Sequence, residues 1–181
     1  MRTTANDILT VAFKEVGTVE KPVNIVKYNK VFGQQGLQWC QVFVWWVFKQ
    51  VNASFPKSAY TPDGVNWFKK RDLWHEQGTP KTGDVVYFDF PNDDLNRVSH
   101  VGIVVKAMTN DEILCIEGNT SSTDDGDQRN GGMVAIKLRK REHIVGWGRP
   151  PYRKDSTPIV GKIVAFYDKK PKGTEDAGRE V

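Results

Sequence analysis

Residues 39–51, WCQVFVWWVFKQV, form an apolar run that decides how the rest of the chain must be arranged. The run is too long for a typical buried strand and is followed by Asn52 and Pro56, so we predict a buried central helix. The polar, glycine-bearing stretch 33–38, GQQGLQ, ends directly ahead of it. Cys40 is therefore expected at a loop-to-helix junction.

Four later segments have the β-branched and aromatic composition of strands, and turn residues separate them. They are GDVVYFDF (83–90), SHVGIVVKAM (99–108), EILCIEGN (112–119) and MVAIKLRK (133–140). Together they predict an antiparallel sheet, and HIVGWGRPPY (143–152) predicts a closing strand.

Two further helices are predicted ahead of this sheet. The first is capped by Asn6 or Thr4 and ends at Gly17. The second follows the Thr-Pro pair at 61–62, because proline suits the first turn of a helix. The stretch 20–38 predicts a loop with one helical turn. The expected fold is α+β, with N-terminal helices packed on a central antiparallel sheet.

Length and charge set limits on the class of protein. A chain of 181 residues suits one domain with a substantial core. The net charge of +4 is a mild excess without a dominant basic run, so we expect no nucleic-acid partner. Charged residues interrupt the N-terminal stretch 1–17, which excludes a secretory signal, and no apolar stretch of about 18 residues could span a membrane. We expect a monomer made in the cytoplasm.

The composition changes after Pro151 to a Lys-rich stretch with further prolines. We predict a catalytic or binding domain over residues 1–152 and a C-terminal extension or linker over residues 153–181. Within the extension, IVGKIVAFY (159–167) is expected to be a last strand or the start of a linker, and the final dozen residues are expected to be disordered.

Cys40 is the first candidate for chemistry. The reactive form of cysteine is the thiolate, which a helix N-terminus and a neighbouring histidine favour. Backbone N–H groups at such a junction can also stabilise an oxyanion. The alternative is that Cys40 is a small buried apolar residue. Cys115, inside a predicted strand, is expected to be structural.

His100 is the best placed of the three histidines to act as a base, because it begins the predicted strand SHVGIVV. His75, in a charged helical end, and His143, in a basic stretch, are expected at the surface. A base of this kind needs an acceptor that holds its tautomer. Glu117 and Asn119 lie two residues apart on another predicted strand and are the candidates; a structural histidine at a strand end remains the alternative.

A cysteine at a helix start, followed by GDVVYF, SHVGIVV and IEGN, resembles the CHAP-domain peptidoglycan hydrolases of the NlpC/P60-like papain superfamily. The likeness covers about residues 4–150. It implies a papain-like fold with Cys40 as nucleophile, His100 as base, and Glu117 and Asn119 completing the set. The implied partner is bacterial peptidoglycan, cut at the N-acetylmuramoyl-L-alanine amide or within the stem peptide or cross-bridge, with no cofactor.

The resemblance also bears on residues around the nucleophile. Gln38 is the candidate oxyanion donor, with Gln35 and the Cys40 backbone N–H as competitors. Trp39 is expected to pack against the site, and a wall of the substrate groove is the alternative for it. Gln41 stands where this type often has a small residue. The acidic run DDGD, residues 124–127, lacks the spacing of a calcium loop, so no metal is expected.

Because lysins and autolysins are common in this family, we expect a phage lysin that is made in the host cytoplasm and acts on the cell wall. Two alternatives are a catalytically silent wall-binding module and another papain-like amidohydrolase or acyltransferase.

Overall fold

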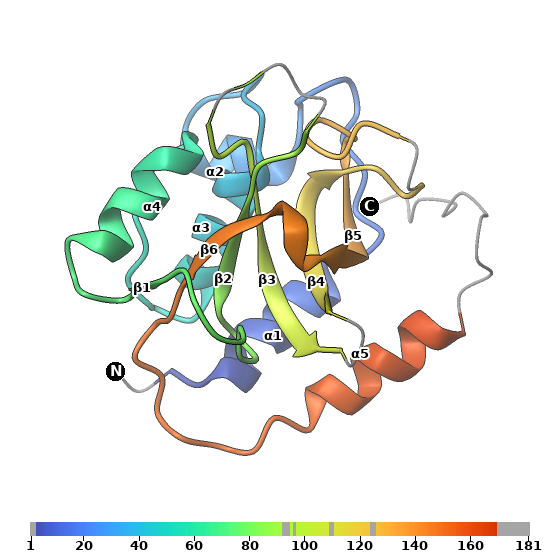
Figure 1. Ribbon diagram of the computed structural model, residues 1–181. Coiled ribbons are helices and arrows are strands. Elements are labelled where there is room, and N and C mark those ends of the chain that lie inside the picture. Colours follow the sequence, from blue (N-terminus) through green and yellow to red (C-terminus); the bar gives the residue numbers. More distant parts are fainter. Residues whose placement is uncertain (1–2, 92–94, 96, 109–110, 124–125, 170–181) are drawn as a thin grey trace.

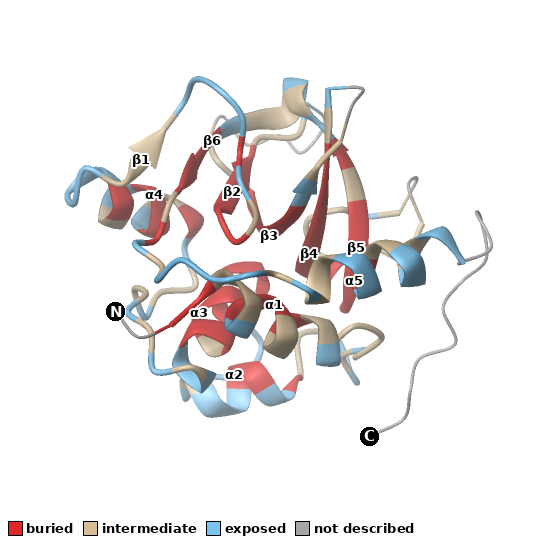
Figure 2. Ribbon diagram, turned by 90° about the horizontal axis from the view of Figure 1, so that it is seen from below, coloured by how far each residue is buried: buried red, intermediate tan, exposed pale blue. Residues whose placement is uncertain are grey.

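The computed structural model describes residues 3–91, 95, 97–108, 111–123 and 126–169, and its centre is one antiparallel sheet (Figure 1). The strand order is β1-β6-β2-β3-β4-β5. Helices α1 and α3 lie together on one side of this sheet (Figure 2), and the strands that face them are buried. The expected α+β fold is confirmed.

The strands follow the segments that the sequence predicts. They are β2 (Val85–Phe88), β3 (His100–Ala107), β4 (Glu112–Thr120), β5 (Met133–Lys140) and β6 (Ile144–Gly148), with a short edge strand β1 (Trp74–His75). The helical end expected around His75 is wrong, because β1 pairs with β6 and His75 lies opposite Trp147. A two-residue strand has no periodicity that a sequence could reveal.

The helices are α1 (Ala5–Lys14), α2 (Lys27–Phe32), α3 (Cys40–Gln50), α4 (Thr61–Lys69) and α5 (Ile159–Asp168), with a 3-10 turn at Arg141–His143. Of the two predicted caps, Thr4 is the one used: its side chain accepts from Asp7 N–H, while the Asp7 carboxylate accepts from Thr4 N–H. This capping box fixes where α1 begins. Within the described part of the chain, no helix has the length and apolarity needed to cross a bilayer.

Helix α3 is the central element of the core. Most of its side chains are buried on every side, which explains why the run 39–51 is apolar throughout rather than amphipathic. Its sheet-facing side packs closely on β4 at Gly118, where an added Cβ would lie 2.5 Å from the Phe43 Cβ. The position of the Cys40 backbone therefore depends on this contact between helix and sheet.

The segment 159–167 is a helix, so the expectation of a last strand or linker is wrong. Its apolar residues recur at helical spacing, and the buried Ile163 joins the main core. Phe166 packs edge-on against Phe13 of α1, with ring centroids 5.4 Å apart. The division at residue 152 stays a prediction, and the final dozen residues lie outside the described part of the chain.

The contact between α3 and β4 can be tested at Gly118. We expect Gly118→Ala to destabilise the fold by about 1–3 kcal/mol, because the new methyl overlaps Phe43 and the core must shift. Gly161→Ala in α5 is the matched control, since nothing lies within 4 Å of its added Cβ. Urea unfolding of both variants gives the comparison, and equal stabilities would contradict the close packing.

Candidate active site

Cys40 is the first residue of α3, with Trp39 as the preceding cap residue. The Trp39 indole Nε1 donates to Glu20 Oε2 at 2.6 Å, and its ring packs against Tyr28. Trp39 is fully buried and packs beside the site, and a contribution of Trp39 to a substrate groove stays a prediction. Its role is to anchor the start of the helix that carries Cys40.

Gln41, the unusual residue of the helix, is accommodated by a glycine on α4. Gln41 is fully buried, and an added Cβ on Gly64 would lie 2.5 Å from Gln41 Nε2 and 2.1 Å from the Tyr87 hydroxyl. The crowding that a long side chain would cause is therefore relieved at Gly64.

His100 and Glu117 meet across two neighbouring strands. His100 begins β3, and its Nε2 lies 2.9 Å from Glu117 Oε2 on β4. Gly102, two residues along β3 from His100, is the residue paired opposite Glu117. An added Cβ on Gly102 would lie 2.8 Å from Glu117 Cγ, so this glycine gives the carboxylate room to reach the ring.

The Cys40 thiol lies close enough to the same ring to influence its pKa. Since Nε2 binds Glu117, Nδ1 is the ring atom left to face the sulfur, and among the described residues Nδ1 has no hydrogen-bond partner of standard geometry. The structure thus brings Cys40, His100 and Glu117 into one line across α3, β3 and β4. His75 and His143 lie outside it.

Electrostatics favour the charged forms of His100 and Glu117. Burial alone would lower the pKa of His100, but the neighbouring Cys40 thiol and the Glu117 carboxylate outweigh it and raise that pKa to about 9. Burial would likewise raise the pKa of Glu117, but Arg139 and His100 hold it well below its usual range. An imidazolium next to a thiol stabilises the thiolate that a nucleophile requires.

Asn119 is buried near this line but has different contacts. Its Nδ2 donates to the Arg129 carbonyl at 3.3 Å and to Asn130 Oδ1 at 3.0 Å, which holds the loop that returns to β5. The strand register shifts between Glu117 and Thr120, and Asn119 has a φ of 58°, so simple alternation fails at this point. A role for Asn119 in orienting His100 stays a prediction.

The oxyanion candidates lie at the start of α3. Gln38 is exposed two residues ahead of Cys40, and Gln35 Oε1 accepts from the Val26 N–H at 3.3 Å. The first N–H groups of a helix have no partner inside that helix, so the Cys40 N–H belongs to the same set. Which of these donors acts remains a prediction.

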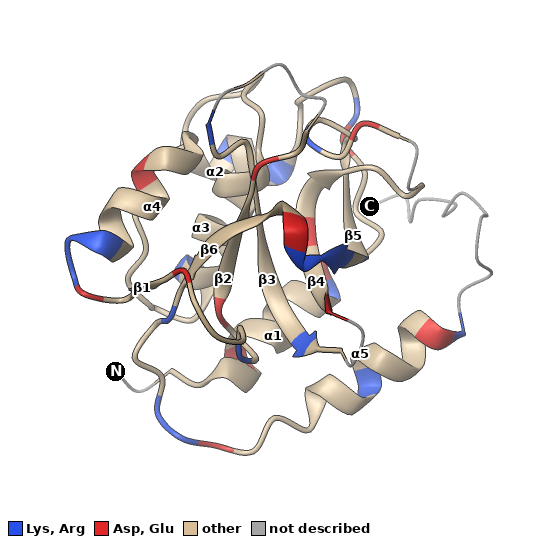
Figure 3. Cartoon of the chain, viewed as in Figure 1, with Lys and Arg blue, Asp and Glu red and all other residues tan. Residues whose placement is uncertain are grey.

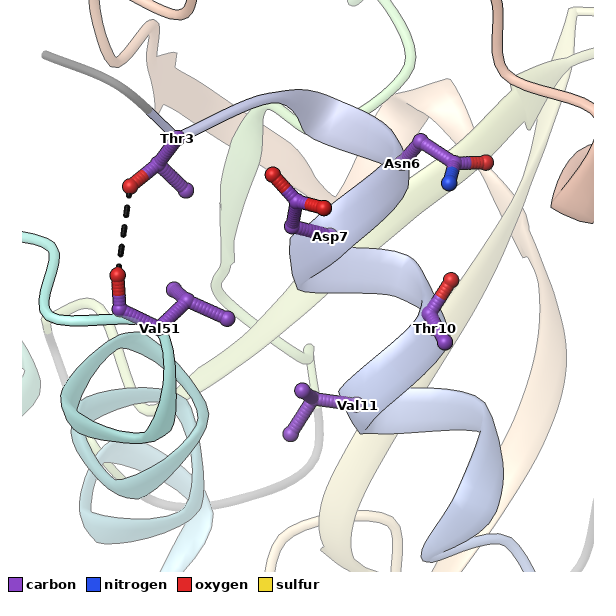
Figure 4. A pocket seen from close by; sticks show the side chains of 6 residues that line it. All are labelled: Thr3, Asn6, Asp7, Thr10, Val11 and Val51. Carbon is purple, nitrogen blue, oxygen red and sulfur yellow. Dashed lines mark hydrogen bonds between the residues drawn. The ribbon is translucent and has the colours of Figure 1, made fainter.

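The line itself is closely packed: Cys40 is 3% exposed, and His100 and Glu117 are fully buried. A cavity of about 500 Å³ lies at the opposite end of α3, beside α1 (Figure 4). Its lining residues are Thr3, Asn6, Asp7, Thr10, Val11 and Val51, none of them a candidate site residue. This cavity is therefore separate from the candidate site.

No group of three His, Cys, Asp or Glu side chains that could hold an ion occurs among the described residues. Asp124 and Asp125 of the acidic run lie outside them, whereas Asp127 Oδ1 accepts from the N–H groups of Arg129 and Asn130.

Cys115 is fully buried on the sheet, and burial raises its pKa well above the usual range. Both cysteines are free. The expectation that Cys115 is a structural thiol agrees with this environment, because an inert thiol is one that stays protonated.

The sequence interpretation overlooked Arg139, which contacts both oxygens of Glu117. A signal was present: Lys137 and Arg139 occupy alternate positions of MVAIKLRK, so they share one face of an otherwise apolar strand. Basic residues on a buried face require acidic partners.

A cysteine at the start of a central helix, facing a histidine on an antiparallel sheet, is the arrangement that the resemblance in the sequence implies. The CHAP domain family model matches residues 32–119, which include Cys40, His100, Glu117 and Asn119. Residues 32–119 are therefore similar to the CHAP domain family. A search of curated proteins gave no significant match.

Solved structures with a similar fold include Ly7917, which is 19% identical in sequence. The match covers 82% of this chain and 63% of the Ly7917 chain, with a TM-score of 0.49. The endolysin LysIME-EF1 is 16% identical, and the match covers 84% of this chain and 66% of that chain, with a TM-score of 0.48. A lipoprotein-like NLP/P60 family protein of Staphylococcus aureus is 15% identical, and the match covers 83% of this chain and 42% of that chain, with a TM-score of 0.44. The chain thus spans less than two thirds of the length of each.

The charge on His100 can be measured directly. We expect its ring to be protonated at pH 7 and to lose the proton near pH 9. Glu117→Gln removes a negative charge, so the cation is less favoured and the pKa should fall below about 8. NMR titration of the three histidine rings measures both values, with His75 and His143 as internal controls. An unchanged His100 titration in the variant would contradict the pairing.

Proposed function

We propose that this protein is a peptidoglycan hydrolase that cleaves an amide bond of the bacterial cell wall with Cys40 as nucleophile. The observation that carries the proposal is the line Cys40–His100–Glu117, located inside the segment that matches the CHAP domain. We further propose that it acts as a phage lysin, a role that rests on the family resemblance.

The chemistry would proceed in two steps. The Cys40 thiolate adds to the amide carbonyl, and the tetrahedral intermediate collapses when the His100 imidazolium gives its proton to the leaving amine. Neutral His100 then removes a proton from water, which attacks the thioester and releases the acid. Glu117 remains ionised throughout and supports the imidazolium whenever it forms.

The oxyanion of each tetrahedral intermediate needs donors beside the sulfur. The proposal assigns them to the Cys40 backbone N–H and the Gln38 side chain, with Gln35 as the competitor. Support comes from their place at the N-terminus of α3, where the helix dipole also favours negative charge.

Peptidoglycan is a fitting partner for the charge of this chain. Basic and acidic residues are both spread over its elements (Figure 3), with a net charge of +4. A mild positive charge favours approach to a wall that carries acidic polymers, although it does not select the bond that is cut.

Loss of the nucleophile tests the proposal. We expect Cys40→Ala to lose nearly all clearing of turbid bacterial wall suspensions, because no other thiol faces His100. Cys115→Ala is the matched control and should retain clearing, since this buried thiol lies outside the line. Wall binding without hydrolysis by the wild type would favour the silent wall-binding module, and equal clearing by Cys40→Ala would overturn the nucleophile.

The bond itself can be read from the products. Cleavage by an amidase leaves a free lactyl carboxylate on muramic acid, whereas an endopeptidase leaves a new peptide terminus within the stem or bridge. Mass spectrometry of digested peptidoglycan separates the two. Release of neither product by active protein would point to a different amide substrate.

A further inference from the structure

We propose that Arg139 is a positioning residue of this site: its guanidinium holds the Glu117 carboxylate in the orientation and charge state that keep His100 competent as a base. The inference rests on the proposed function and extends the line Cys40–His100–Glu117 by one residue, onto the neighbouring strand β5.

The contact between Arg139 and Glu117 is bidentate. Arg139 Nε donates to Glu117 Oε1 at 2.8 Å, and Nη2 donates to Oε2 at 2.5 Å. Oε2 is also the atom that lies 2.9 Å from His100 Nε2. A planar fork that binds both oxygens fixes the plane of the carboxylate, which a single point charge cannot do.

Arg139 is itself held firmly. Nη1 donates to Gln128 Oε1 at 2.9 Å, and Nη2 donates to Thr120 Oγ1 at 3.1 Å. The guanidinium carbon lies 5.0 Å from the centroid of the Phe90 ring, which in turn lies 5.8 Å from that of His100. With Arg139 only 7% exposed, the pair is largely shielded from water.

The charge of Arg139 decides the proton position on His100. An ionised Glu117 accepts from Nε2–H, which leaves Nδ1 free to receive the thiol proton of Cys40. A protonated Glu117 would instead donate to Nε2, and the neutral ring would then carry its proton on Nδ1. That tautomer cannot act as a base toward Cys40. Because burial without a cation drives a carboxylate to take up a proton, Arg139 prevents this inversion.

The test is the rate at which iodoacetamide alkylates Cys40 between pH 4 and pH 9, measured in a Cys115→Ala background so that one thiol reports. We expect Arg139→Gln to lower the alkylation rate at pH 6 by about tenfold or more. This is equivalent to moving the rising, acidic part of the pH–rate profile to higher pH by about one unit or more. Arg139→Lys keeps the charge but loses the fork, and should restore part of the rate.

Arg149→Gln is the matched control. Arg149 forms a similar pair with the buried Asp84, away from Cys40. Its Nε donates to Asp84 Oδ1 at 3.1 Å, and its Nη2 donates to Asp84 Oδ2 at 2.7 Å. Its loss should lower the thermal midpoint as Arg139→Gln does, but leave the pH dependence of alkylation unchanged. This separates a role in the site from a role in stability alone.

A double substitution tests whether Arg139 acts through Glu117. In a Glu117→Gln background, Arg139→Gln should slow alkylation little further, because the carboxylate that it orients is already absent. An unchanged pH profile in Arg139→Gln, or full additivity in the double variant, would overturn the proposal. Should Arg139→Gln not fold, Arg139→Lys decides alone: a wild-type profile refutes the role and a shifted one supports it.

Alkylation of Cys40 needs no cell-wall substrate, so its outcome is independent of the proposed function. A protein that fails to clear walls but shows the expected shift in Arg139→Gln would retain the inference and lose the substrate. Where walls are cleared, kcat should fall in Arg139→Gln while KM changes little, because Arg139 acts through the base rather than on the substrate.

Discussion

The bond between His100 Nε2 and the Glu117 carboxylate is the constraint on which the site depends. Both groups are fully buried, so neither could remain charged without the other and without Arg139. This bond leaves one ring nitrogen to face Cys40. Together with the Cys40 thiol it raises the pKa of His100, so that the protonated ring persists at neutral pH. A series of alternating charges results, which crosses from β3 over β4 to β5, with the Cys40 thiol of α3 beside its first member.

The fold brings these four residues together by placing each at a fixed point of a regular element. Cys40 begins a helix, His100 begins a strand, and the antiparallel register sets Glu117 opposite Gly102. Two glycines provide the space: Gly102 admits the carboxylate, and Gly118 admits Phe43 so that α3 lies close to the sheet. The geometry of the site therefore depends on the close packing of the core, because a shift of α3 would move the Cys40 sulfur away from the His100 ring.

Much of this arrangement could be predicted from local patterns. The apolar run 39–51 predicted the buried helix, alternation predicted the four main strands, and the scarcity of histidine directed attention to His100. The patterns failed where tertiary contacts override them. Segment 159–167 was expected as strand or linker but packs as a helix on α1. Asn119 lies within a shift in strand register that no spacing reveals.

The sequence by itself determined which elements form and which residue types could react, because helix and strand periodicity are local properties of the chain. Only the tertiary structure decided that the Cys40 thiol faces His100 across sixty positions of sequence, that Glu117 rather than Asn119 binds the ring, and that Arg139 completes the charge balance. These contacts depend on strand order, register and the close packing of α3, and each is set by the fold as a whole rather than by neighbours in the chain.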